Sequence, residues 1–223
     1  MIALSHPRTW PIWDLLFPPL CAVCERPMDR NAILYCDQCW ADAPIADMRD
    51  LHQLKYVDST IAGFRYAADD VVKASVQALK YEGMRRVSQA MVRRLLMRIP
   101  PRFMEANLVW SPVPLHWQRQ LTRGYNQSAV LGRDLARLTG HDLPHLLLRR
   151  IRNTPTQTAR SYKERSANVR NAFVVRKDAV IPERVLLIDD VITTGATMDE
   201  CARILKNAGV QWVGALSFAL SHH

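Results

Sequence analysis

Hydrophobic and polar positions alternate between strand-like and helix-like patterns from about residue 60 onward. Short apolar segments rich in β-branched or aromatic residues predict strands at Thr60–Tyr66, Asn107–Val113, Ala172–Val175, Val185–Ile188 and Trp212–Leu220. Segments with apolar residues three and four positions apart predict helices at Asp69–Lys80, Met84–Ile99, Asn126–Leu138 and Met198–Ala208. Because strands alternate with helices, we expect an α/β fold with a mainly parallel sheet flanked by helices.

The segments between these elements indicate how the chain is divided. Gly209 follows the last helix as its expected C′ residue. The Asp-rich stretch Asp42–Asp58 is typical of a linker, and the polar segment Arg149–Arg170 is expected to be mobile at its start. We therefore expect a small module with its linker over residues 1–55 and the α/β domain over residues 56–223.

The unbroken apolar run Val185–Ile188 is typical of a central strand that is buried on both faces. It leads into Asp189-Asp190, and a loop with three threonines and one glycine then opens the next helix. Ligands of open α/β sheets bind outside the carboxyl ends of the strands, where this loop falls. The free N–H groups of a helix start favour an anion, and carboxylates accept from ribose hydroxyls or face Mg²⁺. The sequence therefore predicts a site for a phosphorylated ribose.

Residues of the loop itself sharpen this prediction. Thr193, Thr194 and Thr197 supply hydroxyl donors, and Gly195 lets the backbone approach a phosphate closely. Thr197 and Glu200 fit a capping box, so we expect the helix to begin within the loop. The loop is not a Walker A sequence, because no lysine follows the glycine.

The segment Val185–Thr197 resembles the 5-phosphoribosyl pyrophosphate (PRPP) motif of type I phosphoribosyltransferases. This resemblance implies that Asp189 and Asp190 hold the ribose hydroxyls together with Mg²⁺. It also implies a set of residues for the 5-phosphate: Thr193, Thr194, Gly195, Ala196 and Thr197. In such enzymes a loop comparable to Ser111–Arg119, which its prolines make irregular, binds the pyrophosphate that leaves. Arg119 and Arg123 are then candidate catalytic residues that neutralise its charge.

A second resemblance covers nearly the whole chain. Four features of the chain are similar to the competence-protein ComF family, also called GntX-like proteins. They are the string Pro-Val-Pro-Leu-His-Trp-Gln-Arg at 112–119, the string Arg-Gly-Tyr-Asn-Gln at 123–127, the pair Lys80-Tyr81 and the paired cysteines near the start. The resemblance implies a role in natural competence or in the use of external DNA as a nutrient. It also implies a helicase-type DNA-processing partner.

Four of the five cysteines lie within nineteen residues, as Cys21-x-x-Cys24 and Cys36-x-x-Cys39. Two such knuckles hold one tetrahedral Zn²⁺, because each pair presents two thiolates about a turn apart. Since all four ligands come from the protein, we expect a closed, structural zinc site. Unpaired thiols or a redox pair are the alternatives.

The chain is strongly basic, with a formal net charge of +9. Seven basic residues lie between Lys80 and Arg102, and seven more lie between Arg149 and Arg170, each run with a single glutamate. The guanidinium fork suits phosphate oxygens, so two dense runs beside a phosphate motif indicate nucleotide, pyrophosphate or nucleic acid as partners. We expect single-stranded DNA to contact Arg149, Arg150, Arg152, Arg160 and Arg165.

Three functions remain open from the sequence. The preferred one is a binding protein for DNA processing that keeps a PRPP-type pocket. The others are a Mg²⁺-dependent transferase acting on PRPP with a nucleobase-like acceptor, and a PRPP-sensing regulator. The stretch Met1–Leu20 has no signal-peptide core, and no segment approaches the roughly 18 apolar residues that span a bilayer, so we expect a cytoplasmic protein.

Overall fold

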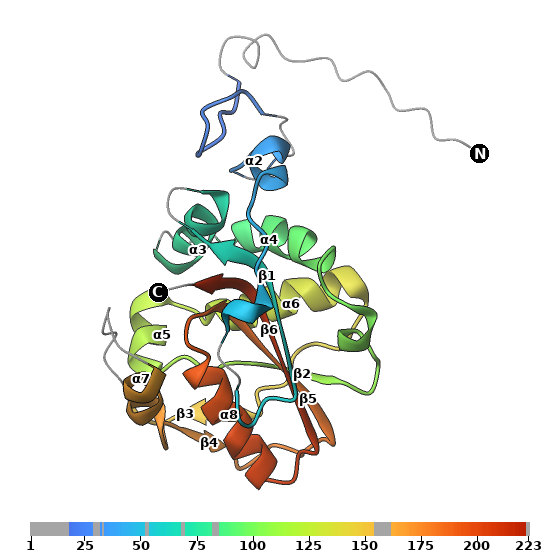
Figure 1. Ribbon diagram of the computed structural model, residues 1–223, viewed down its shortest axis with the longest axis vertical. Helices are drawn as coiled ribbons and strands as arrows, with labels where there is room; N and C mark the ends of the chain where they lie inside the picture. Colours follow the sequence, from blue (N-terminus) through green and yellow to red (C-terminus); the bar gives the residue numbers. More distant parts are fainter. Residues whose placement is uncertain are drawn as a thin grey trace, which may run out of the picture.

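The core of the protein is a parallel sheet whose four strands lie in the order β1-β6-β5-β2 (Figure 1). The computed structural model describes residues 18–28, 32, 34–51, 54–67, 70–81, 85–153 and 162–221. Within these residues the strands of the sheet are β1 (Ser59–Tyr66), β2 (Val109–Pro112), β5 (Arg184–Ile192) and β6 (Trp212–Ser221). Because all four strands are parallel, their carboxyl ends meet at the same edge.

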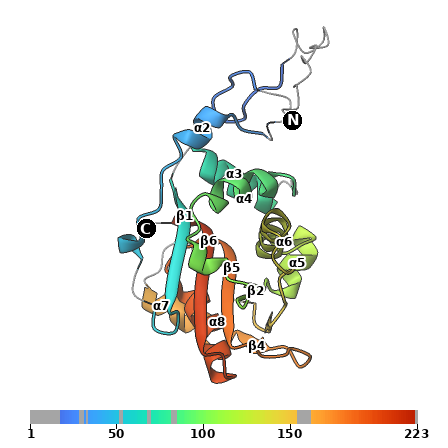
Figure 2. The same ribbon diagram turned by 90° about the vertical axis from the view of Figure 1, so that its right-hand side faces the viewer.

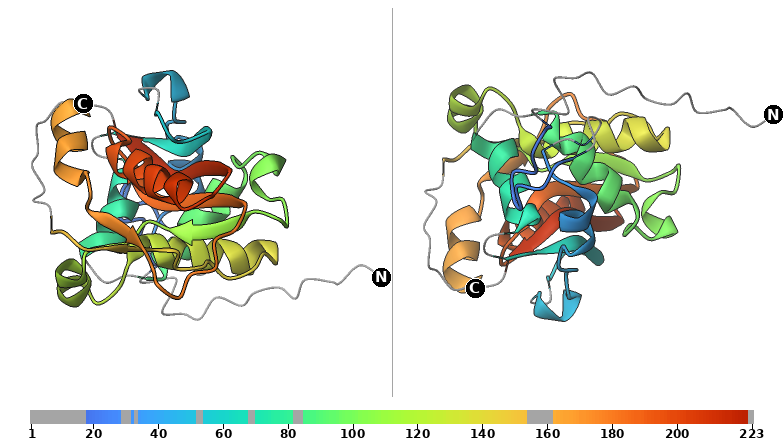
Figure 3. Two further views of the ribbon diagram at one scale, coloured as in Figure 1. Left: turned by 90° about the horizontal axis from the view of Figure 1, so that it is seen from below. Right: turned by 90° about the horizontal axis from the view of Figure 1, so that it is seen from above.

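Helices cover both faces of this sheet (Figure 3). The helices of one face are α3 (Val71–Tyr81), α4 (Val87–Leu96) and α6 (Gln127–Thr139), and the helix of the other face is α8 (Ala196–Asn207). In β5, Leu186 and Ile188 join the core under α3, α4 and α6, here called the main core, whereas Val185 and Leu187 join the core under α8. The expected α/β class with a mainly parallel sheet is therefore confirmed. None of the described helices combines the length and apolar character that a bilayer crossing requires.

Smaller elements complete the fold. They are α2 (Asp37–Ala41), η1 (Met48–Asp50), η2 (Pro101–Phe103), α5 (Trp117–Arg123), β3 (Leu148–Arg150), α7 (Tyr162–Val169) and β4 (Phe173–Val175). α5 occupies the end of the expected irregular loop, because His116 caps its start and Gly124, in the left-handed conformation, ends it. β3 and β4 form an antiparallel pair beside the main sheet. The start of the segment Arg149–Arg170 is therefore part of a strand, which corrects the expectation of mobility.

Strand β5 is longer than the sequence pattern predicted. The apolar run ends at Ile188, but β5 continues to Ile192 because β6 continues beside it, with Asp189 opposite Ser217. β2 ends earlier, with Pro112 opposite Ile188. The two aspartates therefore extend past the end of β2 while they still belong to a strand, and not to a loop.

The capping box expected at the start of α8 is not formed. Gly195 occupies the N-cap position with a φ of 78°, and no side chain caps the helix. Glu200 instead accepts from the backbone N–H of Asn171 at 2.6 Å and pairs with Arg203 at 2.7 Å. The prediction that Thr197 and Glu200 cap each other is wrong, because Glu200 has stronger partners nearby.

The expected linker is packed against the α/β domain. Within Asp42–Asp58, Ile45 forms a β-bridge with Phe64 of β1, and Leu54 is buried beside the loop before α8. Tyr56 donates its backbone N–H to Asp199 in the first turn of α8 at 2.7 Å. This segment therefore helps to fix the start of α8.

The cysteine module lies at one end of the molecule and joins the main core (Figure 2). Trp40 of α2 contacts the rings of Phe64 and Phe218, with centroid separations of 6.0 and 6.2 Å. Asp37 of α2 forms an ion pair with Arg94 of α4. The module and the α/β domain therefore share one hydrophobic core.

Candidate functional site

Two aspartates lie at the carboxyl edge of the sheet, where β5 extends past β2. Ser128 of α6 donates its hydroxyl to Asp189 at 2.6 Å, and the backbone N–H of Asp190 donates to the same oxygen at 2.9 Å. Asp190 is 3 % exposed and pairs with Lys80 of α3, with 2.7 Å between the charged atoms. Helices of one face therefore hold both carboxylates in fixed positions.

The two aspartates have opposite protonation tendencies. Burial and the neighbouring charge of Asp190 raise the pKa of Asp189 to about 8. Burial also opposes ionisation of Asp190, but the charge and hydrogen bond of Lys80 outweigh it and lower the pKa of Asp190. Groups whose pKa values are shifted by burial and by a specific charged partner are enriched at functional sites. Asp190 is therefore the ionised, paired member, and Asp189 is the member that gains most from a cation.

The loop between β5 and α8 has the features of an anion site. Thr193, Thr194 and Thr197 are partly exposed, whereas Gly195 and Ala196 are buried. No side chain caps α8. The first backbone N–H groups of a helix have no partner within the helix, and they favour an anion. A Cβ at Gly195 would lie 2.5 Å from a methyl carbon of Leu54, so both the positive φ and the close contact require glycine there.

Arginines of β3 and α5 lie in the surroundings of this pair: Arg150 is near Asp189, and Arg123 is near Lys80, the partner of Asp190. Arg119 and Arg123 belong to α5, and Arg123 donates to Gln127 at 2.8 Å. Arg150 of β3 lies over the ring of Phe173, and its pKa is lowered by burial and by the nearby charge of Arg119. The negative charge of Asp189 acts on Arg150 in the opposite direction. Arg150 therefore lies near both Arg119 and Asp189.

The arginines expected to contact nucleic acid differ from one another in exposure and in their partners. Arg149 is exposed, whereas Arg150 is half-buried near Asp189. Arg152 donates to the carbonyl of Arg170 at 2.9 Å. Arg160 and the side chain of Arg165 lie outside the described residues.

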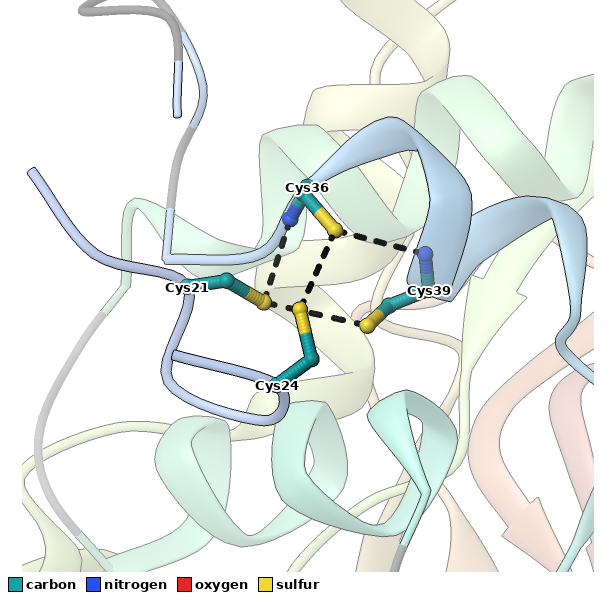
Figure 4. A group of neighbouring side chains, drawn as sticks. All are labelled: Cys21, Cys24, Cys36 and Cys39. Atoms are coloured by element: carbon teal, nitrogen blue, oxygen red, sulfur yellow. Dashed lines mark hydrogen bonds between the residues drawn. The ribbon is translucent and has the colours of Figure 1, made fainter. Parts of the chain in front are cut away.

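The four paired cysteines converge on one point (Figure 4). Their sulfur atoms all lie within 4.8 Å of one another, with Cys21 and Cys39 at 3.8 Å and Cys24 and Cys36 at 3.6 Å. A tetrahedral Zn²⁺ with Zn–S bonds of about 2.3 Å separates its sulfurs by about 3.8 Å. The backbone N–H of Cys36 donates to the sulfur of Cys21, and that of Cys39 donates to the sulfur of Cys36. Such donors stabilise thiolates, so the cluster fits a closed zinc site.

Sequence reasoning missed two residues of the aspartate site. Lys80 was noted only as part of a basic run and of a family motif, and Ser128 was not singled out. Both lie one position from the end or the start of a helix, Lys80 near the end of α3 and Ser128 near the start of α6. The sequence signal that could have indicated Lys80 and Ser128 is their position at the ends of predicted helices, because helix ends can bring side chains to the carboxyl edge of the sheet.

Two parts of the chain match known protein families. Residues 135–223 match the phosphoribosyl transferase domain, and residues 12–49 match the double zinc ribbon domain. The protein is therefore a phosphoribosyltransferase-type α/β domain that carries an N-terminal zinc ribbon.

Relatives of similar length identify the particular family. Competence protein F of Haemophilus influenzae is 32 % identical over 199 residues, which cover 86 % of this chain and 81 % of that protein. DNA utilization protein YhgH of Salmonella typhimurium is 28 % identical, over 95 % of this chain and 90 % of that protein. Competence protein ComFC of Bacillus subtilis is 26 % identical, over 85 % and 72 %. The chain belongs to the competence protein F (ComF) family.

Proposed function

We propose that this chain acts in the uptake or use of external DNA, and that it binds PRPP or a nucleotide together with single-stranded DNA. The names of its relatives, competence protein and DNA utilization protein, support the first part. The second part is supported by the carboxyl end of β5 with the loop that leads into α8, here called the β5–α8 edge. The proposed DNA contacts are Arg149, Arg150, Arg152, Arg160 and Arg165.

The observation that carries the ligand proposal is the position of Asp189 beside an uncapped helix start. In a parallel sheet this edge is where ligands bind. The N–H groups of the first turn and the hydroxyls of Thr193, Thr194 and Thr197 are suited to a 5-phosphate. Asp189 is then suited to the ribose hydroxyls. A ligand that carries a phosphate and a ribose therefore satisfies both halves of the site.

Magnesium is the proposed companion of PRPP at this edge. Its hard charge prefers oxygen ligands, and a carboxylate pair provides them. Because Lys80 already neutralises Asp190, Asp189 is the side chain that would meet the ion. A bound Mg²⁺ neutralises diphosphate charge and favours the ionised form of a nearby carboxylate.

Catalysis is a second proposed function of the same edge. Arg150 lies near Asp189 and near Arg119 of α5, and Arg123 of α5 lies near Lys80. Such charges stabilise pyrophosphate as it leaves C1 of the ribose. Release of pyrophosphate from PRPP in the presence of nucleobases, lost in an Arg119→Gln variant that still binds PRPP, supports transfer. A change in DNA affinity when PRPP is added, with no pyrophosphate released, supports a sensor instead.

A thermal-shift series tests the ligand proposal. A ligand that binds only the native state raises the melting temperature in proportion to RT ln(1 + [L]/Kd). We expect PRPP with Mg²⁺ to raise the melting temperature of the natural protein and of the exposed control Asp142→Asn, but not of Asp189→Asn. If no compound among PRPP, ribose 5-phosphate and the nucleoside monophosphates shifts the natural protein, the proposed ligand class is wrong.

A further inference from the structure

A separate groove lies beside the α5–α6 corner and contains no residue of Asp189–Thr197. Its volume is about 900 Å³. Its walls come from the segment after β2, from α5 and α6, and from β3 with the segment leading into it, and Arg85 before α4 and Arg176 after β4 complete them. Figure 2 shows α5 and α6 on the β2 side of the sheet, away from the zinc module. The groove therefore shares no residue with Asp189–Thr197 or with the zinc site, and it shares only Arg150 with the arginines described near Asp189.

One property of the groove is its charge. Five arginines line it, and none of its described lining residues is acidic: Arg85, Arg133, Arg149, Arg150 and Arg176. Arg133 and Arg149 are exposed and form no ion pair within the described part of the chain. Arg176 forms a bidentate ion pair with Asp178, with separations of 3.2 and 3.1 Å. The described lining therefore carries five positive charges and no negative one, and Asp178, outside the lining, offsets only the charge of Arg176.

A second property is its exposed apolar and aromatic wall. Trp117 of α5 is 58 % exposed, and Leu143 and Leu146 are 60 % and 55 % exposed. Arg85 lies over the ring of Tyr125, 4.6 Å from its centroid, and both residues belong to the lining. Exposed large apolar side chains gathered in one groove mark a binding surface.

We propose that this groove binds single-stranded DNA, with bases stacked on Trp117 and phosphates paired with Arg133, Arg149 and Arg176. Stacking faces between cations are the recurrent features of single-strand sites. A duplex keeps its base faces stacked within the helix, so it cannot use Trp117 in this way. The proposal rests on the proposed function, and it names the surface and adds residues that the basic runs of the sequence did not single out.

Arg150 connects the groove with the phosphoribosyl edge. It lines the groove and lies near Asp189 and Arg119. A strand bound in the groove therefore passes close to the proposed nucleotide site without occupying it.

Fluorescence anisotropy with a labelled 15-mer of deoxythymidine tests the proposal on the full-length protein. The groove variant carries Arg133→Gln, Arg149→Gln and Arg176→Gln. The matched control carries Arg65→Gln, Arg102→Gln and Arg137→Gln, three exposed arginines outside the lining. Both variants lose three positive charges, so long-range attraction changes equally. We expect the groove variant alone to lose roughly tenfold or more in affinity, and its salt slope to fall by about two, since each single-strand phosphate contact contributes about 0.7.

A second variant tests stacking without a change in charge. Trp117→Ala should weaken binding by roughly five- to 150-fold, the range expected for one stacked base, and Trp117→Phe should restore much of it. Trp117 is largely exposed, so circular dichroism should report an unchanged fold. The Asp189→Asn variant should bind the 15-mer like the natural protein, so failure of the ligand proposal and failure of the groove proposal remain distinguishable.

Several results would overturn the groove proposal. One is equal loss in the groove variant and its matched control, which would mean that only net charge matters. Another is full affinity in Trp117→Ala. Equal or tighter binding of a uridine 15-mer, of a duplex or of a poly-glutamate peptide would assign the groove to RNA, to duplex or to an acidic protein instead.

Discussion

Replacement of Asp189 by asparagine should stabilise the protein while it removes ligand binding. Asp189 lies next to Asp190, and burial with this neighbouring charge raises its pKa to about 8. Asparagine has nearly the same shape and keeps an oxygen that can accept from the hydroxyl of Ser128. The substitution therefore removes a carboxylate whose ionisation opposes folding, with little change in packing.

The magnitude follows from the two pKa values. An unfolded chain ionises this carboxyl near pH 3.8, whereas the folded protein keeps the proton until about pH 8. Between these values the folded state binds more protons, so the natural protein loses stability as pH rises. Each unit of pH in this window costs about 1.4 kcal/mol, so the loss at pH 7 is at most about 4.5 kcal/mol. The asparagine side chain has no proton to release, and the variant escapes this loss.

Urea unfolding at pH 4, 5.5, 7 and 8.5, without added ligand, measures this effect. We expect the free energy of unfolding of Asp189→Asn to match that of the natural protein near pH 4 and to exceed it increasingly up to about pH 8. Asp142→Asn, at an exposed position, serves as the control for the substitution itself. A variant that is less stable at pH 7, or a difference that does not change with pH, would refute the electrostatic account of the site.

Three other perturbations probe the remaining parts of the structure. Lys80→Met leaves the buried charge of Asp190 without its partner and should lower the free energy of unfolding by about 3–5 kcal/mol, as measured in urea, with partial recovery in Lys80→Met/Asp190→Asn. Removal of zinc by a chelator, or Cys24→Ser, should lower the melting temperature of the whole protein, because the cysteine module and the α/β domain share a core. A melting curve and a zinc content that chelation leaves unchanged would contradict this. Gly195→Ala should destabilise by about 1–3 kcal/mol through its positive φ and its contact with Leu54, and adding Leu54→Ala should relieve only the contact part. Calorimetric melting of Gly195→Ala, Leu54→Ala and the double variant separates the two effects.

The pattern of apolar residues was sufficient for the main elements of the fold. Val185–Ile188 marked the central strand because burial on both faces requires an unbroken apolar run. The paired cysteines converge as their spacing indicated, since metal ligands constrain short segments strongly. These features depend on local sequence, and local sequence contains the information.

Other features depend on partners that are distant along the chain. β5 continues through Asp189 and Asp190 because β6 runs beside it, and acidic residues alone are typical of a loop. Glu200 does not cap α8, because Arg203 and the backbone of Asn171 hold it elsewhere. Local motifs predict which contacts are available, whereas tertiary structure decides which of them form.

The partners of the aspartates belong to the same category. Lys80 is 110 residues from Asp190 in the chain, and Ser128 is 61 residues from Asp189. Helices α3 and α6 bring them to the carboxyl edge of the sheet. The sequence identified the carboxylates, but only the fold reveals that one is paired with a cation and the other with a hydroxyl.

Isothermal titration calorimetry with PRPP and Mg²⁺ tests the central claim most directly, because it measures binding independently of stability. We predict one PRPP per chain, binding that requires Mg²⁺, and loss of that binding in Asp189→Asn with the fold intact. Heat of binding that is unchanged in Asp189→Asn, or the absence of any binding by the zinc-loaded natural protein, would contradict a phosphoribosyl site at the β5–α8 edge.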